Sequence, residues 1–324
     1  MFDTVPVMQV AVVVYDGVFD SGLTAILDVL SFANALGAQI SDPPTWNVTM
    51  VGPPQVRTGA GLHVAPESLE HAQTADLLVI PALPEMQPSV LLDHVSGDVS
   101  LPVRNLIART RDRGTAVASA CAGTFFLAEA GILDGVRATT TWWLSPAFRA
   151  RYPRVELDYS QMVISCAGIT TAGAAFGHID LALAIVRAGS PALADLVARY
   201  LVIDERPSQS AYTIPSALAQ SDPTVAAFER WTRERLSEPI KMADAAKAIG
   251  VSERTLQRSV QRAIGTSPIR FVQDLRIERA CHLLRTTDLS VETISRKVGY
   301  EHPHTLRVLL RERTGKTPSA LRRR

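Results

Sequence analysis

The segment GTAVASACAGTFFLAEAGILDG (residues 114–135) decides the fold of the first part of the chain. The pattern predicts a buried strand over 115–120, a tight turn, and a helix that begins near Thr124. A residue in such a turn lies at the carboxyl end of a strand and the amino end of a helix, where backbone N–H groups favour a thiolate or a bound anion. Cys121 takes this position, so the segment predicts a nucleophile elbow.

Strand and helix patterns alternate on both sides of this segment. Further strands are predicted at 8–15, 47–51 and 76–81, and helices at 22–36 and 99–113. This alternation is typical of a mostly parallel sheet with helices on both faces. The predicted fold class of the first part is an α/β doubly wound sandwich of the flavodoxin-like type.

Length and composition exclude several classes of protein. With 324 residues and 47% hydrophobic content, the chain can form two domains with cores of their own. No apolar run approaches the ~20 residues that span a bilayer, and the N-terminal sequence lacks a secretory pattern, so we expect a cytoplasmic protein and no membrane association. Three cysteines without metal-like spacing predict neither a disulfide framework nor a metal site, and we expect no cofactor.

Charge is distributed unevenly along the chain, although the net charge is only +1. Residues 1–226 contain 12 Arg and no Lys against 21 acidic residues, whereas residues 227–324 contain 21 Lys and Arg against 11 acidic residues. Such a division is expected where only the second part meets phosphates. A solvated basic helical face would give the same balance. Charge alone therefore does not distinguish DNA binding from a solvated surface, and the sequence motifs are needed to do so.

The second part contains two similar helical pairs. The first, residues 243–258, has small residues in its first helix, Gly250 in the turn, and Ser252 as the cap of the second helix. Residues 291–306 repeat the pattern around Gly299, and a helix over 271–284 connects the pairs. Two such units predict double-stranded DNA as a partner, with each second helix in the major groove.

Outward-facing residues of these second helices are the candidates for base recognition. An Arg can bind guanine through two hydrogen bonds and a Gln can bind adenine, each worth ~1–3 kcal/mol of discrimination. The predicted DNA-binding residues are Arg254, Gln257 and Arg258 in the first unit and His304, Thr305 and Arg307 in the second.

Three regions follow from these patterns. We expect a first domain over 1–203, a linker rich in Pro, Ser and Gln over 204–223, and a DNA-binding domain over 224–324.

The first domain resembles the ThiJ/PfpI superfamily, relatives of class I glutamine amidotransferases, through its elbow and through residues 137–142 and 165–183. The resemblance covers about residues 8–203. It departs from the enzymes at two positions. Thr141 stands where they carry a histidine, and Gly22 stands where they carry an acid, with Asp20 two residues away. A thiol without such partners lacks general acid–base assistance, so we expect no enzymatic activity.

A ligand pocket beyond the carboxyl ends of the strands is the expected use of the elbow. The residues predicted to border it are Asp20, Cys121, Ala122, Thr141 and Trp142. His178 has two interpretations, a replacement base for Cys121 or a histidine that packs between helices.

The second domain closely resembles the AraC/XylS DNA-binding domain through residues 252–258, 265–268, 276–280, 299–300 and 315–318. It departs from that family at Val308, where an arginine is common, and at Leu306 and Leu310, where aromatic residues are common. The two resemblances together are those of GlxA-like transcriptional regulators. They imply a sequence-specific regulator whose first domain binds a small effector, dimerises, or does both.

Homodimerisation would also lengthen the recognised DNA site. The alternatives are a cysteine hydrolase fused to a DNA-binding domain, a redox sensor based on Cys121, and a first domain that serves only to dimerise.

Overall fold

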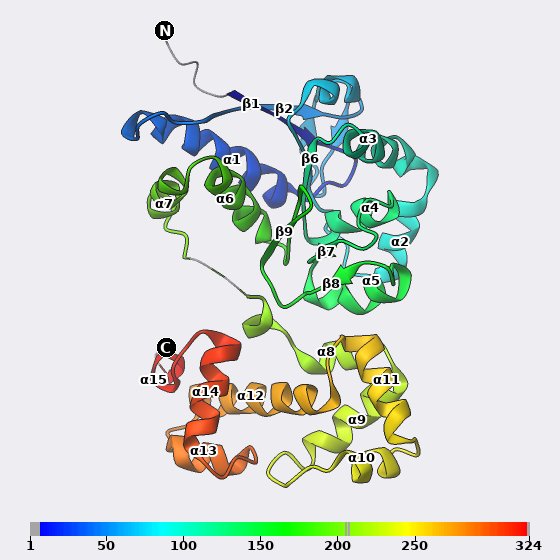
Figure 1. The fold of residues 1–324 in the computed structure, drawn as a ribbon, viewed down its shortest axis with the longest axis vertical. Helices are drawn as coiled ribbons and strands as arrows, with labels where there is room; N and C mark the ends of the chain where they lie inside the picture. Colours follow the sequence, from blue (N-terminus) through cyan, green and yellow to red (C-terminus); the bar gives the residue numbers. More distant parts are fainter. Residues whose placement is uncertain (1–6, 205, 207, 323–324) are drawn as a thin grey trace. The chain divides into compact units, whose positions relative to one another are not determined.

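The computed structural model describes residues 7–204, 206 and 208–322 and divides the chain into two compact units, Met1–Gln209 and Ser210–Arg324 (Figure 1). The range 204–223, expected as a linker, contains the unit boundary and the short helix α8 (Pro215–Ala219). The two units are described separately below.

A six-stranded sheet forms the centre of the first unit. Its order is β2-β1-β5-β6-β10-β9, with parallel pairing throughout except between β10 and β9. Strand β5 is fully buried, and β1 and β6 are buried over their last four residues, because their alternate side chains meet helices on both faces. The bounds are β1 (Val7–Val13), β2 (Thr45–Val51), β5 (Leu77–Ile80), β6 (Ala116–Ala120), β9 (Val163–Cys166) and β10 (Ile169–Ala172).

Helices cover both faces of this sheet, which confirms the predicted doubly wound fold (Figure 1). Helices α1 (Asp20–Leu36), α6 (Gly177–Gly189) and α7 (Pro191–Tyr200) pack together on one face. Helices α2 (Pro88–Ser96), α3 (Leu101–Asp112) and α4 (Thr124–Glu129) lie on the other.

Smaller elements complete the first unit. They are helix α5 (Ser145–Arg151), two-residue strands β3 (Val56–Arg57), β4 (His63–Val64), β7 (Arg137–Ala138) and β8 (Glu156–Leu157), and short 3-10 helices that include η4 (Cys121–Gly123) and η5 (Trp142–Leu144).

One helical stretch among the described residues, Asp20–Gln39, has the length and apolar composition of a membrane-crossing segment. It consists mainly of α1, which packs against α6, α7 and β2 and buries Leu23, Ile26 and Leu30 in the core. The apolar character of this helix is therefore accounted for by its packing in the first unit.

The second unit is helical and contains two helix-turn-helix pairs, α10–α11 and α13–α14, joined by the long helix α12 (Figure 1). Serine side chains cap α11, α12 and α13, and Asp222 caps α9. The bounds are α9 (Pro223–Arg233), α10 (Met242–Ala248), α11 (Glu253–Ile264), α12 (Pro268–Thr286), α13 (Val291–Lys297), α14 (Pro303–Thr314) and α15 (Pro318–Arg322).

Candidate functional site

Helix α11 is the recognition helix of the first pair. Ser252 fixes its start, because its hydroxyl accepts a hydrogen bond from the Thr255 N–H at 3.1 Å. Leu256 and Val260, one turn apart, are buried against the unit's core. The opposite face of α11 is therefore turned to solvent.

Arg254, Gln257 and Arg258 lie on that solvent face, as the sequence predicted. Among the described residues, none makes a side-chain hydrogen bond or ion pair with either arginine. Both guanidinium groups, with five N–H donors each, are available to an outside partner.

Helix α14 of the second pair also carries three predicted DNA-binding residues, but one of them has a partner within the protein. Leu306 and Leu310 are fully buried, and His304, Thr305 and Arg307 are exposed. Arg307, however, donates a hydrogen bond from Nη2 to Oε1 of Glu292 on α13 at 3.1 Å. Arg307, one of the predicted DNA-binding residues, is therefore engaged in an intramolecular ion pair that the sequence patterns did not predict.

Helix α12 sets the separation of the two pairs. Arg276, in its middle, donates to the carbonyl of Glu238 at 2.7 Å, and its guanidinium lies 5.3 Å from the centre of the Tyr300 ring. Near the far end of α14, the mostly buried Arg313 forms an ion pair with Asp274 of α12 at 3.0 Å. Burial raises the pKa of Asp274 to about 6, against the effect of the nearby Arg270 charge. Polar contacts of α12 therefore reach the second pair and also the loop that precedes the first pair.

The elbow of the first unit has the predicted backbone shape. Cys121 directly follows β6 and has a φ of 54°, in the left-handed region that β-strand and helix residues avoid. Its carbonyl accepts a hydrogen bond from the Thr140 hydroxyl at 2.7 Å. The structure therefore holds a nucleophile-elbow turn by contacts from the loop after β7.

The Cys121 thiol itself is not activated. Burial raises its pKa to about 12, while the Ala122 N–H and the Thr141 hydroxyl lower it. The Thr141 side chain that lowers this pKa is fully buried beside the thiol. Since the thiolate is the nucleophile, a neutral buried thiol has little reactivity near pH 7.

Asp20 is turned to another part of the first unit. Its carboxylate accepts hydrogen bonds from the Thr58 hydroxyl and from the Ala60 N–H. Cys121, Ala122 and Thr141 are buried together around the elbow, and Trp142 follows them half-buried. Four of the five predicted pocket residues therefore lie at the elbow. The carboxylate of the fifth, Asp20, is hydrogen-bonded to the loop between β3 and β4.

His178 packs between helices, which is one of its two interpretations from the sequence. Its ring fills the space beside Gly22, where an added Cβ would lie 2.7 Å from the ring. Nε2 accepts from the Ala82 N–H at 3.2 Å and Nδ1 donates to the Ala175 carbonyl at 2.7 Å. Burial lowers the pKa of His178 to about 4, so the ring is neutral and both nitrogens are occupied. The histidine therefore takes the space of the side chain that Gly22 lacks.

Gln209 anchors the end of the first unit beside the elbow, and no sequence pattern predicted this role. The side chain is fully buried, and its amide donates to the carbonyls of Thr140 and Tyr159, both at 2.9 Å. Its Oε1 accepts from the Trp142 N–H at 3.3 Å. Thr140 thus contacts Cys121 through its hydroxyl and Gln209 through its carbonyl.

A doubly wound domain with a cysteine at its elbow, followed by two helix-turn-helix pairs, is the organisation of a class of helix-turn-helix transcriptional regulators. Residues 8–188 match the DJ-1/PfpI family and residues 245–324 match the helix-turn-helix domain. The chain belongs to the DJ-1/PfpI family and carries an AraC-type DNA-binding domain at its C-terminal end. The expected GlxA-like organisation is confirmed.

Known relatives have the same two-part character. The HTH-type transcriptional regulator CdhR of Pseudomonas aeruginosa is 29% identical over 308 residues, which cover 92% of this chain and 86% of the relative. The HTH-type transcriptional regulator GlxA of Rhizobium meliloti is 25% identical over 65% of this chain and 66% of its own length. A ThiJ/PfpI family protein from Pseudomonas syringae shares the fold, with a TM-score of 0.50, 19% identity, and coverage of 63% of this chain and 80% of that one.

Proposed function

We propose that this regulator works in the cytoplasm as a homodimer that binds double-stranded DNA sequence-specifically, and that its first domain binds a small effector without turning it over. The observation that carries the proposal is the solvent face of α11, where Arg254, Gln257 and Arg258 stand together without intramolecular partners among the described residues. A recognition helix of this kind can read guanine and adenine edges in the major groove.

The two helices would contribute unequally to this recognition. Arg254 and Arg258 of α11 can reach base edges without breaking any contact. Arg307 of α14 first has to leave Glu292, so part of its interaction with DNA is offset by the lost ion pair. His304 and Thr305 remain exposed and available on the same helix. We therefore assign most of the sequence discrimination to the first pair.

Other exposed cations of the second unit fit phosphate contacts, which position a protein on DNA without reading sequence. This set consists of Lys241, Arg296, Lys297, Arg311 and Lys316. Together with the basic balance of residues 227–324, they support a strongly salt-dependent affinity.

Effector binding, and not catalysis, is the use that the elbow supports. A hydrolase would need a base for Cys121, and His178 has both ring nitrogens in other hydrogen bonds. A redox sensor would need an accessible thiol of low pKa, whereas Cys121 is buried with a raised one. The elbow residues Cys121, Ala122, Thr141 and Trp142 stay our candidates for effector contacts, together with Asp20 at the start of α1.

The test is binding of the full chain to DNA, first to the region upstream of its own gene and then to sites selected from a random library. Fluorescence anisotropy across a salt series would compare Arg258→Ala with Arg109→Ala, an exposed arginine on α3 of the first unit. We expect Arg258→Ala to weaken the selected site by ~1–3 kcal/mol and Arg109→Ala to leave it unchanged. An affinity without sequence preference would refute the proposal. Sedimentation of the same samples would test the dimer.

A further inference from the structure

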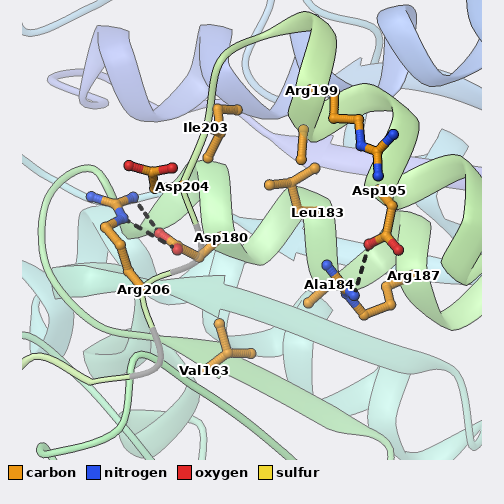
Figure 2. A pocket seen from close by; sticks show the side chains of 11 residues that line it. Val163, Asp180, Leu183, Ala184, Arg187, Asp195, Arg199, Ile203, Asp204 and Arg206 are labelled. Atoms are coloured by element: carbon orange, nitrogen blue, oxygen red, sulfur yellow. Dashed lines mark hydrogen bonds and ion pairs between the residues drawn. The ribbon is translucent and has the colours of Figure 1, made fainter. Parts of the chain in front are cut away.

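A cavity of the first unit lies away from the elbow. It has a volume of about 540 Å³ and is bordered by α6, α7, β9 and the side chains of Ile203, Asp204 and Arg206 (Figure 2). Its volume falls in the range of small-molecule sites. None of the five predicted elbow-pocket residues lines it. Its base is apolar, with Val163, Leu183 and Ile203, and its border carries six charged residues, Asp180, Arg187, Asp195, Arg199, Asp204 and Arg206.

The six charges form two ion pairs and two unpaired groups. Arg206 binds Asp180 through both carboxylate oxygens, and Arg187 binds Asp195 at 3.1 Å. Asp180 is only 10% exposed, and the Arg206 charge opposes the effect of burial on its pKa. Arg199 and Asp204 make no ion pair or side-chain hydrogen bond among the described residues of the first unit. The cavity therefore offers one cation and one anion for an outside partner.

The unpaired groups stand on different sides of the apolar base. Figure 2 shows Asp204 beside Arg206 on one side and Arg199 near Asp195 on the other, with Ile203 and Leu183 between them. A ligand with one charge would satisfy one side only. A ligand with opposite charges at its two ends, joined by a hydrocarbon spacer, would satisfy both sides and cover the apolar base.

Residues near the C-terminal end of the first unit form part of this cavity. Val202, at a φ of 54° and 90% exposed, turns the chain back at the end of α7, because the Ile203 N–H donates to the Ala198 carbonyl at 2.8 Å. This turn brings Ile203 and Asp204 to the cavity, seven and six residues before Ser210, where the second unit begins. An occupant therefore contacts the segment that leads to the DNA-binding unit.

We propose that this cavity binds a small zwitterion, with its cationic group at Asp204 and its carboxylate at Arg199, and that the bound ligand immobilises residues 198–204. The inference rests on the proposed function in one respect, the assignment of effector binding to the first domain. It differs in placing a ligand site at α6 and α7, separate from the elbow.

The test uses the full chain and a series of ω-amino carboxylates from β-alanine to 6-aminohexanoate, with hexanoate and hexylammonium as probes of single charge. Calorimetric titration would show saturable binding for one or two neighbouring chain lengths, at least tenfold tighter than for either single-charge probe. Arg199→Gln and Asp204→Asn would each weaken that binding by tenfold or more. Arg109→Gln, on the opposite face of the sheet, would leave it unchanged. Hydrogen exchange over 198–204 would slow in the complex.

Three results would overturn the site: no saturable binding by any member of the series, binding that Arg199→Gln and Asp204→Asn leave intact, or binding that Trp142→Ala abolishes in their place. DNA affinity, measured on the same preparations, separates this failure from that of the proposed function. Sequence-specific DNA binding with an empty cavity would end only the cavity proposal. Loss of specific DNA binding in the unmodified chain would end the proposed function.

Discussion

His178 shows how one buried side chain can fill the space beside a glycine and be fixed there by hydrogen bonds. Its ring occupies the space beside Gly22 and is held by hydrogen bonds at both nitrogens. The packing depends on a neutral imidazole, since Nε2 has to accept from Ala82. Protonation would break that bond and place a charge in the core.

Acid should therefore destabilise the first unit through this residue. The pKa of His178 is about 4 in the folded chain against 6.5 in the unfolded chain, so the unfolded chain binds the proton more readily between these values. The stabilisation by the neutral ring is present above pH 6.5 and lost as the pH falls toward 4. We expect the unfolding free energy of the first unit to fall by about 2 kcal/mol from pH 7 to pH 5 for this group alone.

Chemical denaturation at a series of pH values would measure this loss. His178→Gln should be less stable at pH 7 and should lack that part of the pH dependence. An identical slope in the variant and the unmodified chain would show that another group is responsible.

The ion pair between Arg307 and Glu292 leads to a prediction of opposite sign, a gain of DNA affinity. Glu292→Gln removes the partner that holds Arg307 at 3.1 Å, and should strengthen binding to a selected site by a factor of roughly 2 to 5. Glu312→Gln, another exposed acid that lies on α14, controls for the loss of a negative charge near DNA. The gain should vanish in an Arg307→Ala background. An equal gain from both Glu→Gln variants would mean that Arg307 is not restrained.

Among the elements, α12 has the clearest structural task, because its side chains reach both helix-turn-helix pairs. Arg276→Met would remove the bond to the Glu238 carbonyl and the contact with Tyr300 while keeping the length of the side chain. We expect about a fivefold loss of affinity for DNA that spans two major-groove turns, and little change for DNA that spans one, because each helix alone still fits its groove. Arg270→Met, exposed on the same helix, is the control.

The regular elements could be predicted from the sequence because their signals are local. The apolar runs at 8–15 and 76–81 predicted β1 and β5 to within two residues at each end. Ser252 and Gly265 mark the two ends of α11, as their capping preferences predict. The elbow followed in the same way from a strand, a short turn and a helix. Arg254, Gln257 and Arg258 were found because helical periodicity separates an inner from an outer face.

Features that depend on contacts across the chain could not be predicted. The bond of Arg307 to Glu292 joins two helices, and the bonds of Gln209 join residues about 50 to 70 positions apart. The packing of His178 against Gly22 had one sequence signal, the glycine at a position where relatives carry an acid, but its partner lay more than 150 residues away. The cavity at α6 and α7 depends on the turn at Val202. A turn with positive φ is usually indicated in a sequence by a glycine, and here the position holds valine.

At the scale of the whole molecule, Gln209 is the last residue of the first unit and is buried in it. Gln209→Ala would leave the carbonyls of Thr140 and Tyr159 without this donor. We expect a loss of about 2 kcal/mol in the first unit, which corresponds to roughly 4–8 °C in its melting temperature. Gln220→Ala, an exposed glutamine just after α8, should change neither. Differential scanning calorimetry of the full chain would measure both variants.

The same substitution should expose the chain around the unit boundary to proteases, because the side chain that fixes it has been removed. Faster cleavage near residues 204–213, with an unchanged DNA affinity, would place the effect in the connection and not in the DNA-binding unit. An unaltered cleavage rate would show that other contacts are sufficient to hold this segment.

The pair formed by Arg307 and Glu292 also bears on how target promoters would diverge. Base pairs under α11 face unrestrained arginines, so most mutations there would abolish regulation and be removed by selection. Base pairs under α14 face an arginine already occupied within the protein. An alignment of natural operators should therefore show two adjacent groove segments of unequal information content, with one nearly fixed and the other free to drift between genes.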